Sequence, residues 1–206
     1  MTETLAEAPG TRGRLVSAAA RLFLARSYHA VGVDELCATA GVRKGSFYYH
    51  FSSKADLMKA VIDRHADALW TRLATTADLP DPASRLRGLI DAVGAIQEEF
   101  ESYFGTVVGC PFGNLAAEVA AADADLAAHL QQIFGTWQRC LSEQCRQAAA
   151  EGVLVAGTDP DQLARILLAQ FQGMILLAKT DSSPARDITA ALHDVLDHYL
   201  VQERLR

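Results

Sequence analysis

The apolar positions of the chain recur with helical spacing along almost its whole length. The first run of them follows the i, i+4, i+7, i+8 pattern of a helix with one buried face, at Leu15, Ala19, Leu22 and Phe23. Thr11 stands where a side chain could cap that helix. Two short helices are predicted next, over 34–40 and 44–50, and no segment alternates polar and apolar residues convincingly as a half-buried strand does. The pattern therefore predicts an all-α protein.

Longer helices follow, separated by recognisable start and stop signals. Ser53 with Asp56 three residues later has the spacing of an N-terminal cap, and Asp159-Pro160 and Ser183-Pro184 are typical helix starts. We expect these helices over 53–77, 83–103, 114–122, 123–152, 159–180 and 184–203. The total is about nine helices, with no internal repeat.

Composition narrows the class of protein. The 206 residues suffice for one domain or two small ones. Met1–Gly10 has no apolar core and is expected to be a leader rather than a signal peptide, and no apolar run reaches the roughly 18 residues of a membrane span. The four cysteines form no CxxC pair, which argues against a disulfide framework or a zinc site and fits a cytoplasmic location.

Charge is divided unevenly along the chain. Residues 11–60 carry eight basic and three acidic side chains, a balance of +5, although the whole chain has a net charge of −6. A basic head on an acidic body is expected to present one face to phosphates and to repel them elsewhere.

The basic head contains a compact pattern over residues 31–51. Two short helices meet at Ala40-Gly41-Val42, where the glycine permits a sharp turn. The apolar side chains of this segment would pack on the first helix, which leaves a polar set pointing outward: Arg43, Lys44, Gly45, Ser46, Tyr48, Tyr49 and His50. A short helix with a small, basic N-terminus fits a major groove, with Lys44 reaching a guanine edge or a phosphate. Tyr48, His50 and Lys54 offer hydrogen-bond donors to phosphates.

Residues 14–62 resemble the DNA-binding domain of the tetracycline-repressor-like (TetR/AcrR-type) family of transcriptional regulators. The resemblance is carried by Ala19, Phe23, Tyr28, Val33, Ala40, Gly41, Val42, Gly45, Tyr48, His50, Phe51, Lys54 and Leu57. It implies groove contacts from Lys44, Gly45, Ser46 and Tyr49, and contacts to the DNA backbone from Tyr48, His50 and Lys54. Ser27 departs from the glycine that this family often has after the first helix. The expected domains are a helix-turn-helix domain over 11–55 and a ligand-binding and dimerisation domain over 56–206.

The resemblance also implies a homodimer held by the last two helices. The apolar residues expected at that interface are Leu167, Phe171, Met174, Leu177, Leu192, Leu196 and Tyr199. The alternative is that these stripes serve only the core of one chain. Two reading helices in a dimer would match successive major grooves of a palindromic site.

An effector pocket is expected among the body helices. Its candidate lining is apolar and aromatic, which suggests an apolar effector: Trp70, Phe100, Phe104, Cys110, Phe112, Phe134, Trp137, Phe171 and Met174. Each could instead be ordinary core. The segment Gly109–Glu118 resembles a GC-x-x-GN segment in a branch of the family with members that respond to electrophiles or small aldehydes and acids. Cys110 before a helix N-terminus is then either a reactive thiol or a small buried residue.

Other functions are weaker alternatives. His193, Asp194, Asp197 and His198 could suggest a metal, but the histidines point about 140° apart on a helix, so a solvated face is the better interpretation. No hydrolase, zinc-protease or nucleotide-binding motif occurs, so neither an enzyme nor a cofactor is expected. A protein-interaction module would not need the basic head. The sequence thus predicts a ligand-responsive regulator, more a repressor than an activator, that binds operator DNA as a dimer and is released by a small apolar or electrophilic effector.

Overall fold

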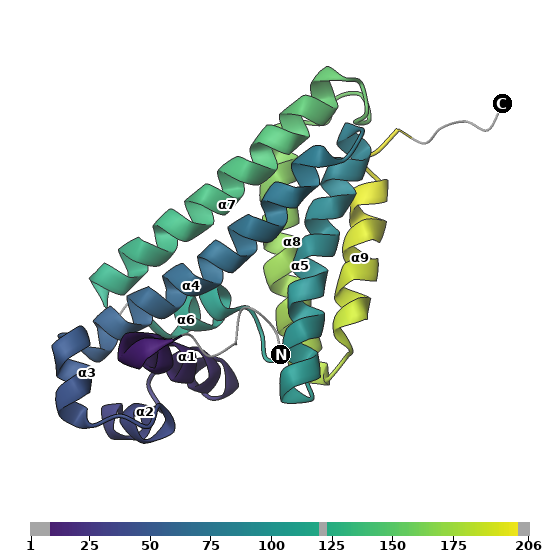
Figure 1. Ribbon diagram of the computed structural model, residues 1–206. Coiled ribbons are helices and arrows are strands. Elements are labelled where there is room, and N and C mark those ends of the chain that lie inside the picture. The colour runs from purple at the N-terminus through teal and green to yellow at the C-terminus, as the bar shows by residue number, and fades with distance from the viewer. Residues whose placement is uncertain (1–8, 120–122, 202–206) are drawn as a thin grey trace. The chain divides into compact units, whose positions relative to one another are not determined.

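The computed structural model describes residues 9–119 and 123–201, and this part of the chain is all-helical as predicted. Nine α-helices and one short 3-10 helix lie within it (Figure 1). Their bounds are α1 Gly10–Ala25, α2 Val33–Thr39, α3 Lys44–His50, α4 Lys54–Ala74, η1 Thr75–Asp78, α5 Pro82–Phe104, α6 Pro111–Val119, α7 Ala124–Ala150, α8 Pro160–Asp181 and α9 Ala185–Asp197.

The described chain packs as two compact units. Unit 1 contains the residues up to Ala68 together with those from Val108 to Gln132, and unit 2 contains Leu69–Val107 and the residues from Ile133 onward. Helices α4 and α7 each run from one unit into the other. Helix α6 packs with the predicted DNA-binding head, although the predicted functional boundary lies between residues 55 and 56.

Helices α1, α2 and α3 pack on one another in unit 1. Leu15, Leu36 and Phe47 are fully buried and supply the apolar contacts that the helical pattern predicted. Gly41 takes a φ of 63°, and the Val42 N–H then donates to the Cys37 carbonyl at 2.9 Å. Glycine adopts this left-handed conformation without the steric cost of a Cβ, which explains the tight turn between α2 and α3.

The start of α6 is shaped by the GC-x-x-GN segment. Gly109 has a φ of 99°, and a Cβ there would lie 2.8 Å from Asn114 Nδ2. The Asn114 side chain donates to the Val108 carbonyl at 2.9 Å, while its backbone N–H donates to the Cys110 carbonyl at 2.8 Å. Glycine and asparagine are therefore both needed for the turn that leads into α6.

In unit 2, α9 packs against both α5 and α8 (Figure 1). Asp159 caps α8 by accepting from the N–H groups of Asp161 and Gln162, as its position before Pro160 predicted. Asp81 caps α5 in the same way, with Pro82 in the first turn, so α5 begins one residue earlier than expected.

Several predicted helix ends are wrong. Thr11 does not cap α1, because that helix begins at Gly10 after Pro9. Ser183 does not cap α9, whose N-cap is Pro184. The last helix ends at Asp197 instead of continuing to 203, since Val155 and Val201 donate to the carbonyls of Tyr199 and Val153 in a short antiparallel bridge. The leader up to residue 8 and the predicted helix ends at 120–122 and 202–203 lie outside the described residues.

Candidate DNA-reading helix and regulatory body

The predicted DNA-contacting residues gather on and around α3, mostly in solvent. Tyr49 is 85% exposed and Tyr48 53% exposed, whereas Phe47 between α3 and the rest of the head is fully buried. Arg43, Lys44 and Gly45 are exposed, and Ser46 and His50 are half-buried. The Tyr48 ring packs edge-on against Phe47 with ring centres 5.1 Å apart, so the two tyrosines and the two basic residues form a polar and aromatic surface that faces solvent.

Lys44 is held by a neighbouring helix. Its Nζ lies 2.7 Å from Asp34 Oδ1 of α2, and this bond, with the attraction between the charges, raises the pKa of Lys44. Both side chains are exposed, so water screens the pair and a phosphate can compete for the ammonium.

Lys54 occupies a more enclosed position than the sequence suggested. Its Nζ donates to the Tyr28 carbonyl at 3.1 Å and to the Val31 carbonyl at 3.2 Å, and lies 4.3 Å from the centre of the Tyr28 ring. Burial lowers the pKa of Lys54, and the nearby carboxylate of Glu118 opposes this effect. Its ammonium therefore supports the head, and its predicted phosphate contact stays a prediction.

Ser27 fits the turn after α1 without a left-handed backbone. Its hydroxyl accepts from the Ala30 N–H at 3.2 Å, which replaces the flexibility of glycine with a hydrogen bond. The departure from the family pattern therefore leaves the turn well formed.

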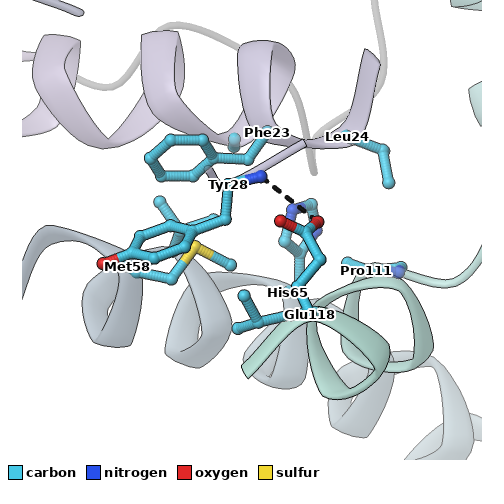
Figure 2. Close-up of a pocket in the computed structure, with 10 residues that line it drawn as sticks. Phe23, Leu24, Tyr28, Met58, His65, Pro111 and Glu118 are labelled. Carbon is cyan, nitrogen blue, oxygen red and sulfur yellow. Dashed lines mark hydrogen bonds between the residues drawn. The ribbon is translucent and has the colours of Figure 1, made fainter. Parts of the chain in front are cut away.

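Glu118 of α6 is a polar residue of unit 1 whose role sequence reasoning missed. Its carboxylate accepts from the backbone N–H of Tyr28 at 3.3 Å (Figure 2). It also accepts from the backbone N–H of His29 at 3.1 Å. About 90 residues separate these partners in the chain, so no local pattern could have revealed the contact.

A small cavity lies beside this carboxylate. It has a volume of about 10 Å³, which is room for about one water molecule, and its lining includes Phe23, Met58, His65 and Leu115 (Figure 2). Burial, and to a smaller extent the charge of Arg64, lowers the pKa of His65 to about 4. His65 is therefore neutral at physiological pH.

The predicted effector residues divide by exposure into five buried and four half-buried side chains. In unit 2, Phe100, Trp137 and Phe171 are buried, and the last two stack with ring centres 5.7 Å apart, so they act as core. Cys110 and Phe112 of unit 1 are also buried. The half-buried candidates are Trp70, Phe104, Phe134 and Met174. None of the nine lines the cavity beside Glu118.

Most of the predicted dimer residues belong to the core of the single chain. Their side chains are at most 1% exposed, so they cannot touch a partner without rearrangement: Leu167, Phe171, Leu192 and Leu196. Met174 and Tyr199 are half-buried, and Tyr199 lies beyond α9 in the antiparallel bridge. Leu177 is 56% exposed, and its neighbour Leu176, which the sequence pattern did not single out, is 58% exposed.

Two of the residues considered as metal ligands pair with neighbouring side chains, and two of the cysteines have raised pKa values. His193 Nε2 lies 2.7 Å from Asp91 Oδ1 of α5, and Asp197 pairs with Arg87. Burial raises the pKa of the Cys145 thiol to about 12, with a further contribution from Asp161, and burial also raises the pKa of Cys140.

Two family profiles together match most of the chain. Residues 15–61 match the family described as bacterial regulatory proteins, tetR family, and residues 82–193 match the tetracyclin repressor-like, C-terminal domain. The chain is 38% identical over 162 residues to the transcriptional regulator AcuR of Cereibacter sphaeroides, covering 77% of this chain and 72% of AcuR. The chain belongs to the TetR family of transcriptional regulators, which are DNA-binding helix-turn-helix proteins and not enzymes.

Other similar proteins are regulators of the same family. The repressor NemR of Escherichia coli is 30% identical over 176 residues, covering 84% of this chain and 86% of NemR. Among solved structures, a regulatory protein TetR from Rhodobacter sphaeroides has a TM-score of 0.80 at 32% identity, covering 92% of this chain and 99% of that one. A reduced form of E. coli NemR has a TM-score of 0.79 at 25% identity, covering 95% of this chain and 100% of that one.

Proposed function

We propose that the protein is a cytoplasmic, homodimeric repressor that binds a palindromic operator through α3 and is released by a small effector. The observation that carries the proposal is the surface of α3, where Tyr48 and Tyr49 stand exposed beside Arg43 and Lys44. These side chains offer stacking and hydrogen-bond donors to bases and phosphates. Repression is favoured because the relatives NemR and DhaR are named repressors.

The dimer is supported by the surface of α8. Among the described helices, α8 alone is long and apolar enough to cross a membrane, yet only 33% of its most apolar 18-residue stretch is buried. A palindromic operator needs two reading helices, which a dimer supplies. We therefore infer that the exposed side chains of Leu176 and Leu177 pack against a second copy of the chain.

The effector is proposed to be small and either apolar or electrophilic. The half-buried aromatics of unit 2 favour an apolar molecule, and Cys110 at the start of α6 favours an electrophile such as a quinone. Effector binding would displace α4, whose first turns lie in unit 1 with the reading helix.

The operator is tested first by selecting bound fragments from a genomic library and measuring their affinity over a salt series. We expect tight binding that weakens steeply with salt, because phosphate contacts release counterions. Tyr49→Ala should weaken specific binding by about tenfold or more. Tyr103→Ala is the matched control, because Tyr103 is also exposed but lies in unit 2. Equal affinity of both variants, or no selected fragment, would reject the proposal.

The electrophile hypothesis is tested on the same operator complex. A quinone should release the wild-type protein and Cys140→Ser, but not Cys110→Ser. Cys110 is only 6% exposed, so its reaction requires local opening and should be slow. Equal release of all three proteins would leave the apolar effector as the proposal.

A further inference from the structure

The turn between α1 and α2, residues 26–32, is bonded from two sides by charged groups. On one side, Glu118 Oε1 accepts from Tyr28 N–H at 3.3 Å, and Oε2 accepts from His29 N–H at 3.1 Å and lies 3.1 Å from His29 Nδ1. On the other side, Lys54 Nζ donates to the carbonyls of Tyr28 and Val31. Tyr28 is therefore tied through its N–H to α6 and through its carbonyl to α4.

The carboxylate contact differs from an ordinary surface hydrogen bond in its charge and in its partial burial. The Glu118 side chain is only 22% exposed, and a carboxylate that accepts from two consecutive N–H groups forms charge-assisted bonds in a partly dry place. The buried His65 beside the same cavity is neutral because its pKa is about 4, so it does not compensate the negative charge. The negative charge of Glu118 acts on Lys54, on the other side of the turn, where it opposes the lowering of the Lys54 pKa by burial.

Both ends of α6 are thus fixed within unit 1. Its start is set by Gly109 and Asn114, and its last turn carries Glu118. The turn held by Glu118 leads directly into α2, which packs on α3. A group on α6 therefore controls where the helix-turn-helix begins.

We propose that Glu118 is a positioning residue for DNA binding, which fixes the turn 26–32, and through it α2 and α3, to α6. This inference rests on the proposed role of α3 as the reading helix. Loss of the carboxylate frees the turn, and the order that it supplied must then be restored when DNA binds, so operator affinity falls.

The direction of this effect separates positioning from simple electrostatics. Removing a negative charge from a DNA-binding protein should by itself strengthen binding, because DNA is an anion. The proposal predicts the opposite sign for Glu118→Ala. Glu118→Gln keeps one oxygen acceptor and should show a smaller loss. Glu98→Ala, at an exposed glutamate of unit 2, removes the same charge as a control.

The test combines hydrogen exchange of the full-length protein with operator affinity, at a temperature where circular dichroism shows every variant folded. In Glu118→Ala we expect faster exchange over residues 26–32 and operator binding about tenfold weaker, with a smaller loss in Glu118→Gln. The salt slope should stay that of the wild type, since no phosphate contact is removed. Glu98→Ala should match the wild type in exchange.

Two results overturn the inference: unchanged exchange at 26–32 in Glu118→Ala, or faster exchange with unchanged or stronger operator binding. If the wild type binds no operator, the proposed function is wrong, and so is the inference that Glu118 positions α3 for DNA binding. The exchange measurement then still decides, independently, whether Glu118 holds the turn.

Discussion

Lys54 shows how one side chain can serve the fold and the DNA together. Its ammonium donates to two backbone carbonyls and lies over the Tyr28 ring, so it stabilises the head before any phosphate is present. A prediction about DNA binding at this residue must therefore be separated from one about stability.

We predict that Lys54→Met lowers the free energy of unfolding by about 1–3 kcal/mol, because two buried carbonyls lose a charged donor. Urea denaturation measures this value. Lys59→Met is the control, since Lys59 Nζ lies 3.6 Å from the exposed carboxylate of Asp125 and such pairs contribute less than about 1 kcal/mol. If Lys54→Met were as stable as the wild type, the ammonium would be free for phosphate contact instead.

His65 makes the stability of the protein depend on pH. Burial lowers its pKa in the folded state from 6.5 to about 4, so the unfolded chain binds a proton more readily than the folded one between these values. The stabilisation is complete above about pH 6.5 and is lost progressively as pH falls toward about 4. Between pH 7 and pH 5 this amounts to roughly 2 kcal/mol.

His65→Gln removes the titrating group, so its stability should fall less than that of the wild type over the same pH interval. Denaturation midpoints at pH 7 and pH 5 for both proteins provide the measurement. The other titrating groups are common to both and cancel in the comparison. An identical loss in the two proteins would show that the pKa of His65 is the same in the folded and unfolded states, against this prediction.

At the scale of elements, α5 and α9 approach each other closely at Gly94 in unit 2. This buried glycine faces Thr189, and a Cβ placed on it would lie within 3.2 Å of Thr189 Cβ and still closer to the hydroxyl. The contact explains why a residue with poor helix propensity stands within α5.

We predict that Gly94→Ala destabilises the protein by about 1–3 kcal/mol, because the steric overlap outweighs the gain in helix propensity. Thr189→Ala should restore most of the loss in the double variant, since it removes the overlapping atoms. Thermal unfolding of the four proteins in this cycle checks the coupling. Additive effects of the two substitutions would mean that α5 and α9 move apart freely.

The elements themselves were largely predictable, because local chemistry determines them. The Ser53 hydroxyl accepts from Asp56 N–H at 3.0 Å, and Gly41 makes the expected turn. The start of α5 was readable too, since Asp81-Pro82 is the same signal as Asp159-Pro160. The end of α9 was not, because the bridge that stops it pairs Leu154 with Leu200 across more than 40 residues.

The candidate sites were harder to predict, since they depend on contacts distant in sequence. The exposed face of α3 followed from helical spacing, as Tyr49 shows. The role of Glu118 did not follow from the sequence, because its hydrogen-bond partners Tyr28 and His29 lie about 90 residues earlier in the chain. The apolar stripes of α8 and α9 indicated burial correctly, but periodicity cannot tell whether Leu192 packs on its own chain or on a second copy.

For the whole molecule, the question of dimerisation depends on the apolar surface of α8 that remains exposed in the folded single chain. Leu176 and Leu177 are consecutive on α8 and are 58% and 56% exposed, so they place apolar surface in solvent over about 100° of the helix circumference. Two large exposed leucines side by side favour a protein interface.

We predict that a Leu176→Glu/Leu177→Glu double variant is monomeric, because two carboxylates would be buried against their own copies at a symmetric interface. Light scattering should give the mass of one chain, whereas the wild type and Val155→Glu, which alters an exposed valine outside α8, should give the mass of two. The monomer should bind the palindrome at least about 100-fold more weakly, because the second half-site no longer benefits from the first. A double variant that stays dimeric would place the interface on another face of the chain.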